Sequence, residues 1–228
     1  MINNYEMLMI IVAISAYLIG CINSSILFGK ILHPEKNIRE VGSGNPGFTN
    51  AMRMGKRVGI LTFVGDFTKG VIAVWLGRTI ICMQPAFAED IIMMQYAAYL
   101  AGIMCFLGHV YPCFFKFKGG KGILTTWAAI TIIDWRISLI TICVFLIVLF
   151  FSKMVSLASV CAAAAFPIVT FLITYLIDYK HLNDMQYVIF STLVTLIMAI
   201  IIIYKHKSNI IRILNGSERK ITDKNSNK

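Results

Sequence analysis

Residues suited to phosphate binding are most concentrated at positions 108–122, GHVYPCFFKFKGGKG, which we name the lysine segment. It places three lysines, one histidine and four glycines between two apolar runs. Glycines let backbone N–H groups turn toward an anion, and lysine side chains supply positive charge. We therefore expect a phosphate-bearing ligand here. The residues expected to bind it are Lys118, Gly119, Gly120 and Lys121.

The lysine segment matches the nucleotide-binding P-loop pattern only in part. Gly122 follows Lys121 where the pattern requires Ser or Thr, and Phe115 stands in place of its first glycine. ATP hydrolysis is therefore not supported. A polybasic patch for anionic lipid is the alternative, although such a patch does not need glycines.

A second candidate, the glycine segment, covers residues 41–53, VGSGNPGFTNAMR. It satisfies the G-x-G-x-x-G pattern, but no strand precedes it and no βαβ unit could house it, so the dinucleotide interpretation fails. Its glycines can still turn amides toward an anion, and an arginine can grip a phosphate through two parallel bonds. A flexible cytoplasmic turn would use the same residue types. The expected phosphate-binding residues are Gly42, Gly44, Thr49, Asn50 and Arg53, and Ser43 and Asn45 add hydrogen-bonding groups.

An ion pair is expected inside an apolar run, where GDFTKG at residues 65–70 places Asp66 and Lys69 three positions apart. At this spacing the two side chains share one face of a helix. Because a charge at bilayer depth costs about 2.5–3.5 kcal/mol, the pair should face the bundle interior or a wet cavity. We interpret it as support for the site, with a purely structural pair as the alternative.

The third polar segment, the C-terminal motif, reads HKSNIIRILNGSE at residues 206–218. His206 and Asn209 are spaced i, i+3 and share one side of a continued helix, which Arg212 extends. His206 can act as an acid or a base near neutral pH. An amphipathic cap beside the membrane is the alternative. His109, at the end of an apolar run, could be a structural hydrogen-bonding residue or a catalyst.

The elements that position these segments are membrane helices. Of the 228 residues, 58% are hydrophobic and 14% charged, and the mean hydropathy is +0.76, which indicates a polytopic membrane protein. Residues 137–177 cannot form one spanning helix, because these 41 residues would reach about twice the hydrocarbon thickness. The natural break lies at residues 151–154. We expect seven helices, with six as the alternative, at residues 5–27, 59–83, 91–110, 123–133, 137–151, 155–177 and 187–204.

The charge distribution predicts the orientation. The net charge is +10, and alternate sides of the membrane place 17 of the 21 lysines and arginines together with the three polar segments. Lys and Arg in short loops favour the cytoplasm, so the N-terminus should lie outside and the C-terminus inside. That result requires an odd number of crossings. The charge therefore follows membrane topology and does not indicate nucleic-acid binding.

Cysteine usage and the N-terminus carry little chemistry. The six cysteines are scattered without a C-x-x-C pair, so we expect no metal site and no disulfide framework. The N-terminus lacks a basic region before its apolar run and is expected to be a retained first helix.

Taken together, the segments resemble the bacterial acyl-phosphate:glycerol-3-phosphate acyltransferase family, PlsY. The resemblance rests on GSGNPGFTNAMR at residues 42–53, GDFTKG at 65–70, GHVYPCFFKFKGGKG at 108–122 and HKSNIIRILNGSE at 206–218. These motifs occur in the same order and spacing over nearly the whole chain. Phe48 departs from the pattern, where alanine is expected, and this puts local packing in question.

The resemblance implies an enzyme of the inner membrane with seven helices and a cytoplasmic active site. Such an enzyme moves a fatty acyl group from acyl phosphate to the 1-hydroxyl of glycerol 3-phosphate. The products are lysophosphatidic acid and phosphate, in the first acylation of phospholipid synthesis. The implied partners are the two substrates and the bilayer, with no nucleic acid and no cofactor, and the chain is expected to be a monomer.

The residues found fit the chemistry that the resemblance implies, and we expect them to divide its tasks. Acyl phosphate has a good leaving group, so no covalent enzyme nucleophile is required, and the protein must hold two anions and stabilise an oxyanion. The general base is His206, with His109 behind it, or else a phosphate oxygen of the substrate. The residues expected around the reacting centre are Ser43, Asn45, His206 and Asn209. The residues expected to support them are Asp66, Lys69, His109 and Glu218.

The expected organisation is one membrane domain at residues 1–205, a C-terminal motif at 206–222 that completes the site, and a disordered tail at 223–228. Acyltransferases that use acyl-CoA or acyl carrier protein carry a His-x₄-Asp motif, which none of the four histidines here provides. An organic-phosphate transporter is the alternative from another class. It fits less well because the polar groups gather on one side and no inverted repeat is visible. A non-catalytic lipid-binding scaffold would leave the ordered glycines unexplained.

Overall fold

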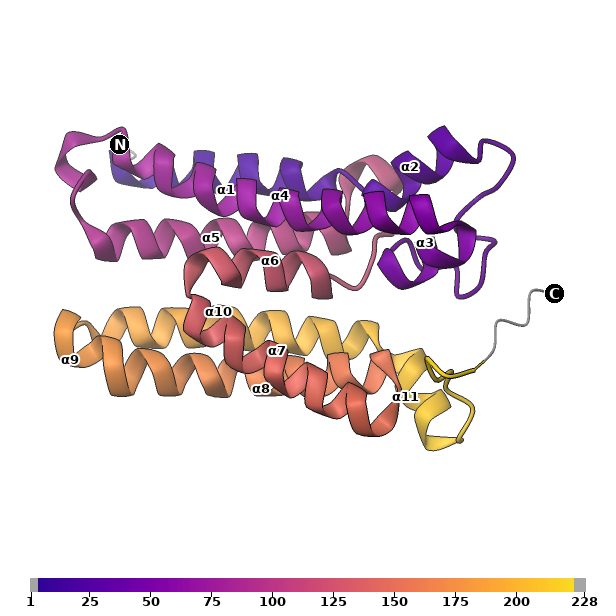
Figure 1. Cartoon of the computed structure of the whole chain (residues 1–228). Coiled ribbons are helices and arrows are strands. Elements are labelled where there is room, and N and C mark those ends of the chain that lie inside the picture. The colour runs from indigo at the N-terminus through magenta and orange to yellow at the C-terminus, as the bar shows by residue number, and fades with distance from the viewer. Residues whose placement is uncertain (1–3, 224–228) are drawn as a thin grey trace. The chain divides into compact units, whose positions relative to one another are not determined.

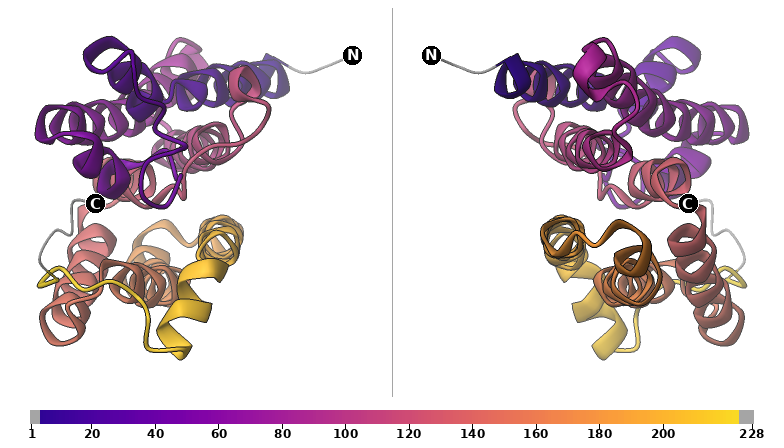
Figure 2. Two further views of the ribbon diagram at one scale, coloured as in Figure 1. Left: turned by 90° about the vertical axis from the view of Figure 1, so that its right-hand side faces the viewer. Right: turned by 90° about the vertical axis from the view of Figure 1, so that its left-hand side faces the viewer.

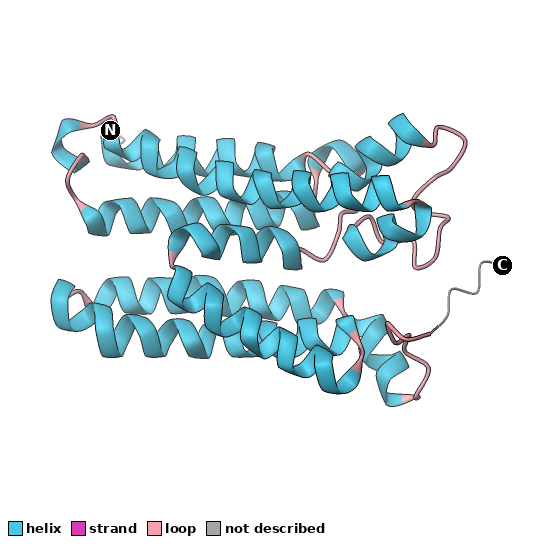
Figure 3. Cartoon of the chain, viewed as in Figure 1, coloured by secondary structure: helices cyan, strands magenta, loops and turns pink. Residues whose placement is uncertain are grey.

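The computed structural model describes residues 4–223, which form helices joined by loops, with no strand among them (Figure 3). The prediction of an all-α chain is confirmed. The chain divides into two compact units, Met1–Trp135 and Arg136–Lys228, whose helices are labelled in Figure 1. Each unit is described by itself. The tail expected to be disordered lies outside the described residues from position 224 onward.

The first apolar run folds as two helices, where the sequence predicted one helix over residues 5–27. α1 covers Asn4–Cys21 and α2 covers Ser24–Leu32. Between them, the side-chain oxygen of Asn23 accepts a hydrogen bond from the N–H of Ile26 at 3.1 Å. An asparagine that satisfies an N–H in the first turn starts a new helix, which explains the interruption.

Small residues bring the long helices of the first unit together. A Cβ atom at Gly20 would overlap the carbonyl of Cys105, and one at Gly108 would overlap the carbonyl of Tyr17. Membrane helices associate closely where such small residues face a neighbouring backbone. Figure 2 shows the helices of this unit side by side in end view. Besides α1 and α2, they are α4 (Lys56–Cys82), α5 (Ile91–Val110) and α6 (Ile123–Ile133).

Three short helices lie in the connections of the first unit. They are α3 (Phe48–Met54) in the glycine segment, η1 (Pro85–Phe87) before α5 and η2 (Cys113–Phe115) in the lysine segment. Asp90 then starts α5 by accepting a hydrogen bond from the N–H of Met93 at 3.0 Å. The glycine segment thus leads into α4, and the lysine segment follows α5.

The second unit contains three long helices. They are α7 (Trp135–Ser152), α8 (Val155–Ile173) and α10 (Met185–Lys205), of which α8 packs against α10. α8 continues through a π-helical turn, Thr174–Asp178, into α9, Tyr179–Leu182. The short α11, Lys207–Leu214, follows α10 and carries much of the C-terminal motif.

The break predicted at residues 151–154 is present, because α7 ends at Ser152 and α8 begins at Val155. Lys153 between them has a left-handed φ of 58°. At the other end of the unit, the Arg136 guanidinium donates from Nη2 to Asp178 Oδ1 at 2.8 Å. This pair joins the start of α7 to the π-helical turn after α8.

The predicted count of seven membrane helices is one too high by length. Six helical segments among residues 4–223 are long and apolar enough to cross a membrane, so the protein is a multi-pass membrane protein. α6 has only 11 residues, which span about 16 Å at 1.5 Å per residue, roughly half of the hydrocarbon thickness. The predicted orientation of the termini stays a prediction.

Candidate active site

The glycine segment is organised around Asn50, which is only 1% exposed. Its amide nitrogen donates to the carbonyls of Val41 at 2.8 Å and Ile38 at 3.1 Å. Its amide oxygen accepts from the N–H of Ser43 at 3.1 Å and from Arg53 Nη1 at 3.4 Å. Because a side-chain amide has two N–H donors and one oxygen, these bonds engage all of its polar atoms. Asn50, expected to bind phosphate, therefore shapes the loop.

Two glycines are required by this loop. Gly42 and Gly44 have left-handed φ angles of 54° and 67°. A Cβ atom at Gly42 would crowd the side chains of Asn50 and Arg53, and one at Gly44 would lie 2.7 Å from the carbonyl oxygen of Arg39. Glycine is the residue that adopts such angles without steric cost.

The other polar side chains of the glycine segment reach its surface. Ser43, Thr49 and Arg53 are exposed, and Asn45 is half-buried. Phe48, which replaces the alanine expected from the family pattern, is 39% exposed and sets its ring edge-on to Phe63, with centroids 5.6 Å apart. Its bulk therefore points away from the polar groups.

The lysine segment folds back onto the end of α5. The N–H of Gly119 donates to the carbonyl of Val110, and the N–H of Gly120 donates to the carbonyl of His109, both at 3.1 Å. These amides satisfy carbonyls at the end of the helix instead of pointing toward a ligand. The cationic groups that the segment offers a phosphate are the side chains of Lys118, which is exposed, and Lys121, which is half-buried.

The glycine and lysine segments meet within the first unit. Arg39 donates from Nη2 to the carbonyl of Lys118 at 2.6 Å. A Cβ atom at Gly120 would lie 3.0 Å from the carbonyl oxygen of Pro46, so the two backbones also approach there. Sequence reasoning missed Arg39. Its charge just before the glycine segment was the only signal, and nothing local places it beside a residue 79 positions later.

A buried polar cluster lies beneath this junction and consists of Ser24, Asp66, Lys69 and His109. The Lys69 ammonium makes three contacts of 2.8 Å, with Asp66 Oδ1, the carbonyl of Ile22 and His109 Nδ1. Ser24 Oγ donates to the same Asp66 oxygen at 2.9 Å. The expected pairing of Asp66 with Lys69 is confirmed, with exposures of 2% and 5%. Mutual neutralisation allows both charges to lie inside a membrane bundle.

The C-terminal motif is assembled in the second unit around Glu218. This carboxylate accepts three hydrogen bonds of 2.7 Å, from Ser156 Oγ, Asn209 Nδ2 and Arg212 Nε. Ser156 did not stand out in the sequence, because a single serine in an apolar helix is common. The carboxylate thus ties the loop after α11 to Ser156 of α8 and orients Asn209.

The pKa of Glu218 is lowered from its ordinary value of 4.5. Burial is the strongest single influence and acts to raise the pKa, but the hydrogen bonds from Ser156, Asn209 and Arg212, with the charge of Arg212, outweigh it. Glu218 is therefore ionised at neutral pH.

His206 stands at the junction of α10 and α11 and is 3% exposed. Its Nδ1 lies 2.8 Å from the carbonyl oxygen of Ile202. Because a carbonyl only accepts, Nδ1 carries the proton, and Nε2 of the neutral ring holds the lone pair. The ring is thereby prepared to accept a proton at Nε2.

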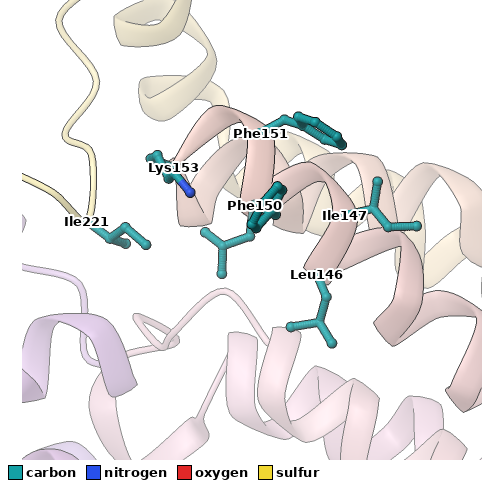
Figure 4. A pocket seen from close by; sticks show the side chains of 7 residues that line it. Leu146, Ile147, Phe150, Phe151, Lys153 and Ile221 are labelled. Carbon is teal, nitrogen blue, oxygen red and sulfur yellow. The ribbon is translucent and has the colours of Figure 1, made fainter.

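An apolar cavity of about 510 Å³ also opens on the second unit (Figure 4). Lys153 is its single charged side chain, lying 4.5 Å from the ring centroid of Phe150. Most of its lining consists of apolar side chains of α7, and in a membrane helix such side chains are covered by lipid. We therefore do not assign the cavity to the site. It is lined by Leu146, Ile147, Leu149, Phe150, Phe151, Lys153 and Ile221.

The structure thus gathers two of the three predicted segments in the first unit and builds the third in the second unit. A family model described as "Glycerol-3-phosphate acyltransferase" matches residues 10–216. Two curated relatives carry that same name. The protein from Clostridioides difficile (strain 630) is 37% identical over 218 residues, covering 94% of this chain and 96% of the relative. The protein from Syntrophomonas wolfei is 35% identical, covering 91% and 94%.

Two solved structures are similar over 93% of this chain and 94% of theirs. Both are crystal structures of PlsY (YgiH), described as an integral membrane glycerol 3-phosphate acyltransferase. The glycerol 3-phosphate form gives a TM-score of 0.71 at 31% identity. The lysophosphatidic acid form gives a TM-score of 0.69 at 30% identity.

Proposed function

Since this chain belongs to the PlsY family of glycerol-3-phosphate acyltransferases, we propose that it transfers a fatty acyl group from acyl phosphate to the 1-hydroxyl of glycerol 3-phosphate. The products are lysophosphatidic acid and inorganic phosphate. The family name and the ligands named for the two similar crystal structures support the acceptor and the product. The donor and the position of acylation are what the resemblance of the motifs implies.

The observation that carries this proposal is the junction of the glycine and lysine segments. Arg39, two positions before the glycine segment, donates to the carbonyl of Lys118, and the backbones of Pro46 and Gly120 approach each other. These contacts support a common site for the cationic side chains of the two segments. The reaction brings two phosphate-bearing substrates together, and their mutual repulsion must be offset. We assign Arg53, Lys118 and Lys121 to the phosphates.

The transfer needs no covalent enzyme nucleophile. The substrate hydroxyl attacks the acyl carbonyl, negative charge develops on the carbonyl oxygen, and the collapse of the tetrahedral intermediate expels phosphate. Donors aimed at the developing oxyanion accelerate this step. Ser43 and Asn45 are our candidates, because both lie in the loop that Asn50 shapes and neither is fully buried. Gly42, Gly44 and Thr49 complete the binding surface.

The hydroxyl proton must be accepted as the new bond forms. We assign this role to His206, whose Nδ1 hydrogen bond to Ile202 leaves the lone pair on Nε2. A phosphate oxygen of the substrate is the competing acceptor, in which case His206 positions the substrate. Asn209, held by Glu218, is proposed to contact the substrate beside it.

The distribution of Lys and Arg supports an inner-membrane location with the N-terminus outside and the site on the cytoplasmic side. This orientation requires an odd number of crossings, which the six long segments give only if α6 also enters the membrane together with the lysine segment that precedes it. We further propose that the chain works as a monomer, since both anion-binding segments come from one copy.

The proposal is tested with protein purified into nanodiscs and given palmitoyl phosphate with and without glycerol 3-phosphate. We expect phosphate and lysophosphatidic acid to form in equal amounts, and only when both substrates are present. Product from acyl-CoA but not from acyl phosphate would overturn the donor assignment. If no acyl donor gives a product and glycerol 3-phosphate crosses the membrane of proteoliposomes, a transporter would be favoured.

Arg53→Ala tests the phosphate assignment, with Arg57→Ala as its matched control. Both side chains are exposed and lie near the same loop, but only Arg53 contacts Asn50. Loss of an ion-paired hydrogen bond should raise KM for glycerol 3-phosphate by about tenfold or more in Arg53→Ala alone. An unchanged KM and kcat in Arg53→Ala would exclude the assignment.

A further inference from the structure

His109 has one ring nitrogen inside the buried polar cluster and the other on its far side. Nδ1 lies 2.8 Å from the Lys69 ammonium. It lies 3.8 Å from Asp66 Oδ1, which is beyond hydrogen-bonding distance. Within residues 4–223, every polar contact of the ring involves Nδ1. The side chain is nevertheless almost fully buried, at 4% exposure.

The contacts of Lys69 determine where the proton of His109 sits. An ammonium group has three N–H donors and no acceptor, and Lys69 directs them at Asp66, at the Ile22 carbonyl and at His109 Nδ1. Nδ1 must therefore accept. The neutral imidazole then carries its hydrogen on Nε2, and this N–H can only donate.

Nε2 faces the junction of the two phosphate-binding segments. A Cβ atom at Gly120 would overlap it, so the ring lies directly against the backbone of that glycine. The same position is 3.0 Å from the carbonyl oxygen of Pro46 in the glycine segment. An N–H donor that points into such a junction is placed to meet an oxygen of a ligand bound there.

The surrounding backbone strengthens the case for a ligand oxygen. The amides of Gly119 and Gly120 already donate to carbonyls of α5, so they leave the binding of an anion to side chains. The lysines offer charge without a fixed direction, whereas an imidazole held on one side by an ammonium has one direction. His109 would supply the directed donor that the segment otherwise lacks.

We propose that His109 is a substrate-binding residue that donates its Nε2–H to a phosphate oxygen held by the lysine segment. The Asp66–Lys69 pair fixes the tautomer of His109 through the contact of the Lys69 ammonium with Nδ1. This assignment rests on the proposed function, and it removes His109 from the candidates for general base. The phosphate belongs to glycerol 3-phosphate or to acyl phosphate, and the measurements below separate the two.

Two substitutions place a polar group on one side of the ring or the other. His109→Asn keeps an amide oxygen where Nδ1 meets Lys69 but has nothing at Nε2, whereas His109→Gln can place an N–H near Nε2. We expect His109→Asn to raise KM by at least about tenfold for the substrate whose phosphate it contacts, with kcat changed less. His109→Gln should keep KM within a few-fold. Equal KM values in the two variants, or a larger rise in His109→Gln, would mean that the ring serves only Lys69.

A measurement without turnover keeps the assignment separate from the reaction and from variants that fail to fold. Protein with ¹⁵N-labelled histidines, in which His33→Gln and His181→Gln simplify the spectrum, is titrated with inorganic phosphate and then with glycerol 3-phosphate. We expect one histidine with its proton on Nε2, whose Nε2 resonance moves as either anion binds. The proposal would be contradicted, even in an active enzyme, if both remaining histidines, His109 and His206, carried the proton on Nδ1. It would also be contradicted if the Nε2–H signal did not shift with either anion.

Discussion

His109 and His206 are both almost fully buried histidines at the ends of long helices, one in each unit. At His109, Nδ1 faces an ammonium and must accept, so the hydrogen lies on Nε2. At His206, Nδ1 faces the carbonyl of Ile202 and must donate, so the lone pair lies on Nε2. The two rings therefore present opposite functions at the same atom, because their Nδ1 partners differ in kind.

The groups that support the two histidines differ as well. Behind His109 lies a buried ion pair at membrane depth, and removing either partner would leave the other charge unpaired. Near His206 stands the Glu218 carboxylate, which three hydrogen bonds hold near the surface. The first region, around His109, is therefore held in place by the free-energy cost of leaving a buried charge unpaired. The second region, around His206, is held by hydrogen bonds to a carboxylate that titrates with pH.

The largest effect is expected from Asp66→Ala, which strands the Lys69 ammonium in the first region. Removing one partner of a buried pair costs about 3–5 kcal/mol. Thermal unfolding in detergent should show a large loss of stability. Glu35→Ala, at an exposed carboxylate, should leave the midpoint unchanged. The double variant Asp66→Leu, Lys69→Met removes both charges. If it regains stability but not activity, the pair contributes to activity through the tautomer of His109 and not only through the stability of the fold.

The second largest effect is expected on kcat from His206→Gln, which cannot take up a proton at this position. General-base catalysis contributes about 10²–10⁴-fold, so kcat should fall by about 100-fold with little change in KM. A loss of only a few-fold in kcat would assign the proton to a substrate phosphate and would weaken the contrast with His109.

Gly120→Ala should lower activity by about tenfold to 100-fold, since its Cβ atom would overlap His109 Nε2 and crowd the Pro46 carbonyl. The matched control is Gly29→Ala, whose Cβ atom would meet only the flexible end of Met54. Steady-state kinetics of both, at equal amounts of folded protein, make the comparison. Equal activity in the two variants would show that the junction at Gly120 tolerates displacement.

The smallest effect concerns pH and the second region. The pKa of Glu218 is lowered in the folded protein, so its stabilisation is present above the unfolded value of about 4.5 and is lost as pH falls through the lower folded value. Limited proteolysis of the C-terminal motif should therefore accelerate in acid, below about pH 4.5. Glu218→Gln should be cut faster at neutral pH and lose this acid dependence, while Glu40→Gln should behave as the unmodified protein.

Much of the fold could be predicted from the sequence because long apolar runs identify membrane helices. The break at residues 151–154 follows from the length of the apolar run, and the all-α architecture follows from the apolar composition. The split of the first run at Asn23 was missed, because capping by one asparagine leaves the hydropathy unchanged. Counted by helix length, the prediction was one too high, because α6 is apolar enough for a crossing but too short to make one by itself.

The candidate site was predictable as a set of segments but not as a set of contacts. Asp66 and Lys69 were paired correctly, since residues three apart on a helix must be neighbours. Asn50 was assigned to phosphate, yet its hydrogen bonds organise the loop. Arg39 and Ser156 went unnoticed, because their partners lie 79 and 62 positions away.

The sequence by itself therefore determined the membrane class, the family and the residue types that meet a phosphate, because composition and local spacing encode these directly. Only the tertiary structure decided that His109 accepts at Nδ1, the opposite of His206. That choice depends on whether an ammonium or a carbonyl stands opposite Nδ1. At His206 the carbonyl belongs to the preceding turn of its own helix, whereas at His109 the ammonium comes from another helix, 40 positions away in the chain.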